Sequence, residues 1–152
     1  MEFEGFTTID FDPRNFDPRR GPGFVYIFLF SVGTDGAPIP FYVGQTHSVC
    51  HRLGHYYWPD FQAPTDFNVG EAVKRLTAAG CRVIAKYIPS TNRKQDETQK
   101  IAECRSQGYT LLNGQKKLGY DYNKTTEAEQ RLKVQTFVDD LLAARNRARG
   151  VS

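Results

Sequence analysis

The sequence is poor in cysteine and has no long hydrophobic run. Its three cysteines, Cys50, Cys81 and Cys104, are widely spaced and form no Cys-x-x-Cys pair. An odd number with this spacing argues against a disulfide framework and is typical of a reducing compartment. No apolar segment approaches the roughly 18 residues of a membrane-spanning helix, and the acidic, mixed N-terminus is unlike a secretory signal. We therefore expect a cytoplasmic protein without membrane association.

A strong excess of charge of either sign is also missing. The 152 residues include 20 lysines and arginines and 17 aspartates and glutamates, which gives a formal net charge of +3. Acidic residues outnumber basic ones in residues 1–22, so the positive excess lies in the rest of the chain. This balance permits a polyanionic partner without requiring one. The length is that of one domain able to bury a core.

Aromatic residues are plentiful, at 13% of the chain, and many of them fall in short apolar runs. The runs at residues 24–32 and 40–44 predict two strands, and the turn residues at 33–38 make them an antiparallel hairpin. Ser48 is placed to cap a helix over residues 49–57. Asn68 and Glu71 have the spacing of a capping box, which predicts a second helix that ends at Ala79.

The second half of the chain continues this pattern. Residues 81–88 predict a third strand, residues 93–107 a polar helix, and Thr126 with Glu129 the start of a final helix. The elements predict an α+β domain in which a small three-stranded antiparallel sheet is flanked by helices, in the order ββααβα, with an added C-terminal helix. We expect an irregular N-terminal arm at 1–22, the main domain at 23–123, and a helix at 124–152 packed on that domain.

Two tripeptides on the predicted hairpin, and residues that follow them, match a known nuclease family. Phe24-Val25-Tyr26 and Tyr42-Val43-Gly44 stand where the GIY-YIG family has Gly-Ile-Tyr and Tyr-Ile-Gly. Arg52 follows the second tyrosine by ten residues, as the family's arginine does, and Tyr56 stands where members carry His or Tyr. The chain therefore resembles the GIY-YIG nucleases over about residues 23–114, and in Tyr56 it is similar to the excision-repair incision nuclease.

The resemblance continues downstream and implies a function. Glu97 precedes Ile101 by four residues, as the family's metal-binding glutamate precedes an aliphatic residue, and Asn113 stands for its last asparagine. The departures are Phe24 in place of the first glycine, a wider tyrosine spacing, and a long interval before Asn113. The resemblance implies an endonuclease that hydrolyses DNA phosphodiester bonds with Mg²⁺ or Mn²⁺, in repair, recombination, restriction or mobile-element transfer.

The resemblance also implies roles for individual residues. Tyr26 is assigned to the attacking water, Tyr42 and Arg52 to the phosphate, and Glu97 to the metal. An arginine fork pairs phosphate oxygens at any working pH, and one glutamate can hold Mg²⁺ whose other ligands are water and phosphate. The predicted catalytic set is Tyr26, Tyr42, Arg52, His55, Tyr56 and Glu97, and the predicted substrate-binding set is Gly44, Lys86 and Asn113.

Each of these residues also has a simpler interpretation. A strand tyrosine is most often packing, and Glu97 in isolation reads as helix surface. Asp96 is the nearest rival as metal ligand, although it lies about 100° around the helix from Glu97. His47, His51 and His55 recur every four residues, which predicts one of two roles. They form a structural zinc site completed by Cys81 or Cys104, or His55 or His51 lines the phosphate site beside Arg52, with His55 able to act as an acid–base group.

The alternative function is a catalytically inactive nucleic-acid-binding or interaction module that retains the fold. Its partner would still be a polyanion such as DNA, and binding would depend on salt. The aromatic residues after the first helix, Tyr57, Trp58, Phe61 and Phe67, fit base stacking as well as packing. Monomer and dimer are both open, because the apolar face of the last helix can cover the core or a second copy.

Overall fold

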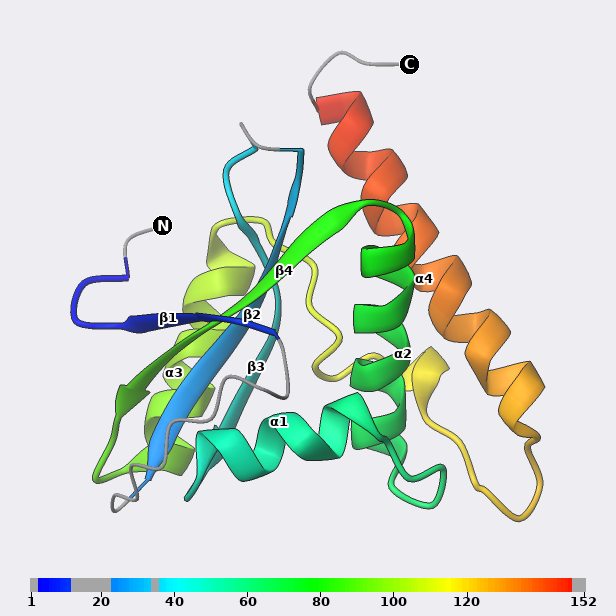
Figure 1. Cartoon of the computed structure of the whole chain (residues 1–152), viewed down its shortest axis with the longest axis horizontal. Helices are drawn as coiled ribbons and strands as arrows, with labels where there is room; N and C mark the ends of the chain where they lie inside the picture. The colour runs from blue at the N-terminus through cyan, green and yellow to red at the C-terminus, as the bar shows by residue number, and fades with distance from the viewer. Residues whose placement is uncertain (1–2, 12–22, 34–35, 149–152) are drawn as a thin grey trace.

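A four-stranded antiparallel sheet forms the centre of the fold (Figure 1). The computed structural model describes residues 3–11, 23–33 and 36–148, except for the side chains of residues 49–51 and 146–148. The strands are β1 (Thr7–Asp10), β2 (Phe24–Val32), β3 (Ile39–Thr46) and β4 (Cys81–Pro89), in the spatial order β1-β4-β2-β3. The prediction of an α+β fold with an antiparallel sheet is confirmed, and β2 lies between β3 and β4.

The predicted three-stranded sheet was wrong, because β1 comes from the segment expected to be an irregular arm. Its four residues pair with β4, with Thr8 opposite Lys86, and an ion pair of 2.7 Å joins Asp10 to Arg82. A short, polar edge strand exposes most of its side chains and has no alternation to reveal it. The element order therefore begins with one strand more than predicted. Residues 12–22 of the predicted arm lie outside the described residues.

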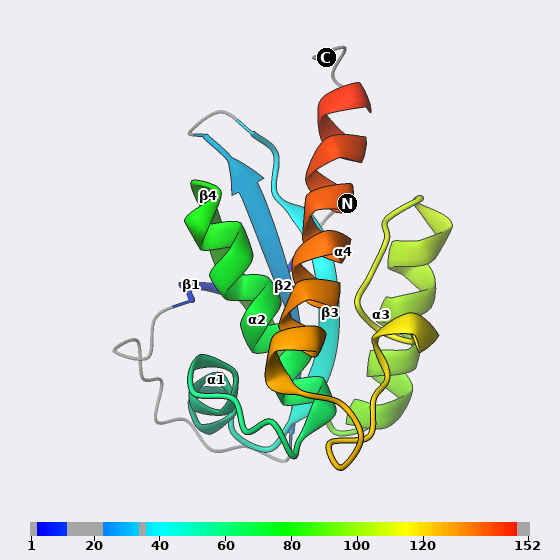
Figure 2. The same ribbon diagram turned by 90° about the vertical axis from the view of Figure 1, so that its right-hand side faces the viewer.

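Helices cover both faces of the sheet (Figure 2). The helices are α1 (Val49–Tyr57), α2 (Pro64–Ala78), α3 (Arg93–Ser106), the short 3₁₀ turn η1 (Lys116–Leu118) and α4 (Glu127–Ala148). The helix α3 lies on one face, and α1 and α2 lie on the other, with α4 beside α2. No helix in the described parts of the chain is both long enough and apolar enough to cross a membrane.

The alternation of side chains along β2 divides the core into two clusters. Tyr26, Phe28 and Phe30 face α1, α2 and α4, whereas Val25 and Ile27 face α3. A β-bulge in the pairing of β2 with β3 lets Phe41 and Tyr42 both join the first cluster. We call the first cluster the tyrosine face and the second the α3 face.

The start of α2 corrects a second prediction. The helix begins at Pro64 rather than at Asn68, because Pro64 occupies the first helical turn and Asp66 supplies the acidic residue that favours a helix N-terminus. Asn68 lies inside the helix, where its side chain donates to the Leu118 carbonyl at 2.8 Å. Ser48 precedes α1 as predicted, but its side chain makes no capping bond.

The C-terminal helix follows the prediction more closely. The Thr126 hydroxyl accepts a hydrogen bond from the Glu129 amide at 3.2 Å, which is the N-terminal half of a capping box. Along its length α4 packs on α2, and Arg75 forks onto the Asp139 carboxylate at 2.9 and 3.0 Å. Packing on the domain, rather than a separate unit, is therefore the arrangement of this helix.

Candidate active site

Three tyrosine hydroxyls meet on the tyrosine face, between β2, β3 and α1. The Tyr26 and Tyr56 hydroxyls are directly hydrogen bonded, and the Tyr56 hydroxyl lies 3.5 Å from that of Tyr42. All three residues are buried, with ring centroids about 6 Å apart at 6.2, 6.3 and 5.9 Å. A buried hydroxyl without a hydrogen-bond partner lowers the stability of the protein. The hydrogen bonds within this cluster therefore offset the cost of burying its three hydroxyls.

Arg52 joins this cluster to solvent. Its Nε donates to the Tyr56 hydroxyl at 3.1 Å, and its guanidinium carbon lies 5.0 Å from the centre of the Tyr56 ring. Arg52 and Tyr56 are one helical turn apart on α1, which is the spacing that stacks side chains on one face. The Arg52 Nη2 lies 3.0 Å from the Asp66 carboxylate, and the side chain is still 30% exposed. A cation thus faces outward directly over three buried phenols.

The pKa values of the three phenols are all raised, in each case mainly by burial. Burial and the charge of Tyr42 raise the pKa of Tyr26, whereas its bond to Tyr56 and the nearby Arg52 guanidinium lower it. Burial also raises the pKa of Tyr56, and the charges and hydrogen bonds of Tyr26 and Tyr42 raise it further. The surroundings of Tyr56 therefore favour its protonated form. Tyr26 loses its proton more readily than Tyr56, because a donor and a cation stabilise its phenolate.

Gly44 has a steric role in this arrangement. It is the residue opposite Tyr26 in the β2–β3 pairing, and a Cβ atom at this position would collide with the Tyr26 ring and hydroxyl. A residue with a side chain would therefore push the phenol away from Tyr56. Gly44 thus makes room for Tyr26, and its substrate-binding role stays a prediction.

Glu97 approaches the cluster from α3. Its side chain is half-buried, burial raises the pKa of its carboxyl, and Arg52 lowers it. The Glu97 charge in turn raises the pKa of Tyr42, after the larger effects of burial, Tyr56 and Arg52. These mutual effects place Glu97 within electrostatic range of both residues. The rival Asp96 is engaged elsewhere, because it accepts a hydrogen bond of 2.5 Å from Ser90.

A divalent metal fits this site through a single protein ligand. No group of three or more His, Cys, Asp or Glu side chains suited to a metal occurs among the described side chains. Mg²⁺ does not need one, because it commonly takes one or two carboxylates and completes its shell with water and phosphate. Glu97 is such a carboxylate, and within the described residues it has neither a hydrogen-bond nor an ion-pair partner.

Asn113 fastens the outer edge of β3 beside the cluster. Its Oδ1 accepts from the Val43 amide at 2.9 Å, and its Nδ2 donates to the Val43 carbonyl at 2.7 Å. The Leu112 amide donates to the Phe41 carbonyl at 2.8 Å, so the segment acts as a short substitute strand. The predicted substrate-binding role of Asn113 is thus accompanied by a structural one, since it holds the strand that carries Tyr42.

A groove of about 540 Å³ opens next to Tyr42. Its walls come from α2 and from the segment between Leu112 and Gly119. The main lining residues are Tyr42, Asn68, Val69, Leu112, Asn113 and Lys116. The groove continues the site from the tyrosine cluster along the surface, with a lysine at its border.

Lys86 lies away from the site, whereas His55 lies at its border. Lys86 pairs with Ile27 in the sheet, so its side chain is on the α3 face, where it donates to the Thr8 hydroxyl at 2.7 Å. The exposed His55 is at the border of the site, with its Nδ1 3.5 Å from the Arg52 Nη1. His47 is exposed, and the His51 side chain lies outside the described residues. The histidine row therefore supplies no described zinc cluster.

Asp66 is the residue that sequence reasoning missed. Its side chain is 15% exposed and bonds the Arg52 guanidinium. The available signal was Pro64 followed by an acidic residue two positions later, which marks a helix N-terminus. Starting α2 at Asn68 placed Asp66 in a loop and hid its contact with α1.

Comparison with models of protein families, with curated proteins and with solved structures found no match for this chain. The functional assignment therefore depends on the residues of the site and their geometry.

Proposed function

We propose that this protein is a GIY-YIG-type, divalent-metal-dependent endonuclease that hydrolyses phosphodiester bonds of DNA. The observation that carries the proposal is the convergence of Tyr26, Tyr42 and Tyr56 under Arg52, with Glu97 of α3 within electrostatic range of Tyr42 and Arg52. Packing alone does not explain this arrangement, because a phenylalanine would fill the same space without a buried hydroxyl.

The geometry suggests a division of labour in the hydrolysis. Tyr26 accepts a proton from the attacking water, since the Tyr56 donor and the Arg52 cation stabilise its phenolate. Arg52 binds the phosphate oxygens, and its charge opposes the negative charge that develops at phosphorus. The exposed part of its guanidinium is the part a phosphate can reach.

The carboxylates of Asp66 and Glu97 have different roles in the proposed site. Asp66 binds Nη2 of Arg52 and Tyr56 binds its Nε, which leaves Nη1, beside His55, as the nitrogen for substrate. Glu97 would hold Mg²⁺ or Mn²⁺ beside Tyr42. Such an ion acts as a Lewis acid on a phosphate oxygen and favours ionisation of bound water. The groove beside Tyr42, bordered by Lys116, offers a path for the DNA backbone.

A cleavage assay tests the proposal. Purified protein with Mg²⁺ or Mn²⁺ is expected to nick or cut DNA, and Glu97→Gln is expected to abolish cleavage while leaving the unfolding curve unchanged. Asp96→Asn is the matched control, because Asp96 is the adjacent carboxylate and bonds only Ser90 among the contacts described above. Equal cleavage by the wild type and the Glu97 variant would overturn the site assignment.

The second candidate is a nucleic-acid-binding module without turnover. The observation in its favour is the Arg52–Asp66 ion pair, which already neutralises much of the charge that a phosphate needs. This candidate predicts salt-dependent DNA binding and no metal-dependent product in the same assay.

A further inference from the structure

Four aromatic residues lie at or after the end of α1, and they divide into two pairs. They are Tyr57, Trp58, Phe61 and Phe67. Phe67 is buried at 3% exposure, and Phe61 stacks on Tyr120 with ring centroids 4.8 Å apart and planes at 13°. Packing accounts for this pair, with Phe67 buried and Phe61 half-buried against Tyr120. Tyr57 is 42% exposed and Trp58 is 70% exposed, which is unusual for large aromatic side chains. Packing does not account for the second pair.

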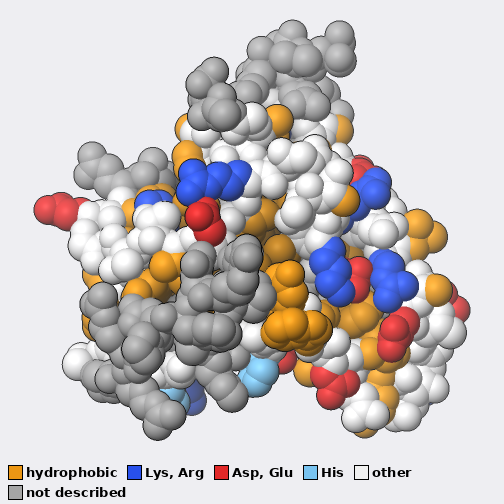
Figure 3. Space-filling model, viewed as in Figure 1, with side chains coloured by type: hydrophobic (Ala, Val, Ile, Leu, Met, Phe, Trp, Pro, Cys, Tyr) orange, Lys and Arg blue, Asp and Glu red, His pale blue; other side chains and the backbone are white. Residues whose placement is uncertain are grey.

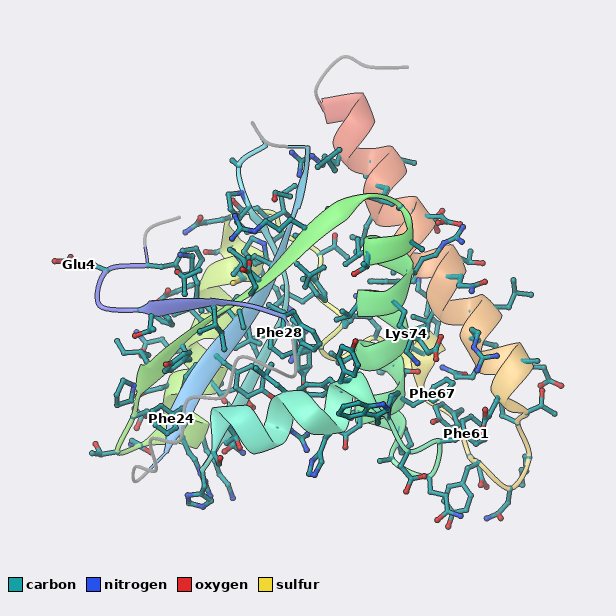
Figure 4. All side chains as sticks on the ribbon, viewed as in Figure 1. Glu4, Phe24, Phe28, Phe61, Phe67 and Lys74 are labelled. Carbon is teal, nitrogen blue, oxygen red and sulfur yellow. The ribbon has the colours of Figure 1, made fainter. Side chains whose placement is uncertain are left out.

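Tyr57 and Trp58 form one wall of a groove between the end of α1 and α2. The groove has a volume of about 630 Å³, and its floor includes Tyr56 and Val73. Gly70 allows this close approach, because a Cβ atom there would collide with the Tyr56 carbonyl. Lys74 lines the same groove with a side chain that is 57% exposed. In Figure 3 hydrophobic side chains gather on this face next to lysine or arginine side chains, and Figure 4 shows Lys74 on α2 above the end of α1.

We propose that this groove binds an unpaired nucleobase of a single-stranded nucleic acid, stacked on Trp58 and Tyr57 with its phosphate near Lys74. The inference rests on the proposed function, because it assumes that the partner is a nucleic acid. A flat heterocycle stacks on an exposed indole whatever its sequence, and a lysine attracts the phosphate next to it. The volume lies within the range of small-ligand sites.

The charge of the groove favours a nucleotide over an apolar peptide or a second copy of the chain. Lys74 is its one charged lining residue among those described, and its Nζ is 3.4 Å from the largely buried Glu71. A cation at the rim of an aromatic groove complements a base that carries a phosphate. The Tyr57 and Trp58 rings meet edge to face, at 4.7 Å and 67°, so one ring face of each remains available to a ligand.

Tyr56 connects the groove to the candidate active site. Tyr56 is one of the residues that line the groove, and its hydroxyl bonds Tyr26 and accepts from Arg52. The groove and the proposed phosphate site therefore share this residue. This arrangement favours DNA that has an unpaired nucleotide next to the cleaved bond, such as a flap, a bubble or a single-strand junction.

The single tryptophan of the chain makes a direct test possible. The fluorescence of Trp58 is measured while the protein, without divalent metal, is titrated with single-stranded oligothymidylate, with an abasic strand of equal length, and with a duplex of equal length. The proposal predicts quenching by the first strand and much weaker quenching by the abasic strand and the duplex. Equal quenching by all three would overturn it, as would Trp58 fluorescence that iodide cannot quench in the free protein.

Variants extend the test to affinity. Trp58→Ala should raise the Kd for labelled oligothymidylate about fivefold to 150-fold, and Trp58→Phe should retain most of the binding. Leu132→Ala is the matched control, because Leu132 is 63% exposed on α4 and outside the groove. Equal binding by the wild type and Trp58→Ala would contradict the proposal. Quenching without cleavage would reject the endonuclease function and support base binding in the groove. Cleavage without quenching would support the endonuclease function and reject base binding.

Discussion

The two faces of the sheet are built from alternate residues of the same strands, yet only one of them contains hydroxyl groups in its core. On β2, Val25 and Ile27 turn toward α3, and Tyr26 between them turns toward α1. The buried residues of the α3 face are aliphatic side chains and Cys104, with Phe3, Phe6 and Tyr109 packed at its border. The tyrosine face buries Tyr26, Tyr42 and Tyr56, whose hydroxyls bond one another and Arg52.

This difference separates residues that hold the fold from residues that are available for chemistry. A core of aliphatic side chains is stable without polar groups, so buried hydroxyls in the equivalent position on the other face call for an explanation. The proposed hydrolysis supplies one. Changes on the tyrosine face should therefore alter activity more than stability, and changes on the α3 face should do the opposite.

The largest expected effect comes from neighbours on β2. Tyr26→Phe removes one oxygen and should lower the cleavage rate about 10²- to 10⁴-fold, the usual contribution of a general base. Ile27→Val on the opposite face should leave the rate unchanged and lower the free energy of unfolding by about 0.5–1.5 kcal/mol. Cleavage kinetics and urea unfolding of both variants measure the two quantities. Similar losses of activity in both variants would contradict the claim that the tyrosine face serves catalysis and the α3 face serves stability.

Arg52→Ala should have the next largest effect. The loss of a preorganised donor to the developing charge lowers the rate by about 10²- to 10³-fold. Arg82→Ala is the control, because Arg82 is an exposed arginine on β4 that pairs with Asp10 rather than with the tyrosines. If both arginine variants lost activity equally under steady-state conditions, general electrostatic attraction of DNA would explain the effect instead.

The pH dependence of cleavage should be steep on the alkaline side. The raised pKa of Tyr26 means that its phenolate is a small fraction of the protein at neutral pH, and this fraction grows about tenfold per pH unit until its pKa is reached. At low pH, protonation of Glu97 should compete with metal binding and lower metal-dependent activity, and more metal should restore it. A pH–rate profile that is flat from neutral to alkaline pH would remove Tyr26 as the base.

The smallest effect is expected for two glycines. Gly44→Ala places a Cβ atom against the Tyr26 phenol and should cost about 1–3 kcal/mol of unfolding free energy. Gly54→Ala on α1 meets no atom within 4 Å, and it should stabilise the protein by about 0.4–1 kcal/mol. Thermal unfolding of the two variants compares them directly. A neutral Gly44→Ala would mean that the close approach of Tyr26 does not limit the site.

The sequence was a good guide to the site wherever spacing along one element set the geometry. Arg52 and Tyr56 lie one turn apart on a helix, and Tyr26 and Tyr42 lie on paired strands, so the motif alone brought the four residues together. Their catalytic roles remain predictions. The ion pair of Asp66 with Arg52 could not be predicted from spacing, because it joins two helices and depends on where α2 begins.

Other errors came from information that periodicity does not contain. Both faces of the sheet are covered, so the sequence of β4 did not show that Lys86 turns toward α3. The strand β1 was missed because a four-residue edge strand with exposed threonines has almost no apolar signal. Both cases required tertiary pairing, Lys86 opposite Thr8 and Ile27, rather than local pattern.

The bonds from Asn113 to Val43 also affect how this protein meets other copies of itself. An open strand edge is a template on which a foreign strand can add and start aggregation. Here the amide of Asn113 and the backbone of Leu112 occupy donors and acceptors on the outer side of β3. Replacing Asn113 would thus do more than loosen Tyr42, since it would free the amide and carbonyl of Val43 for a foreign strand in concentrated solution.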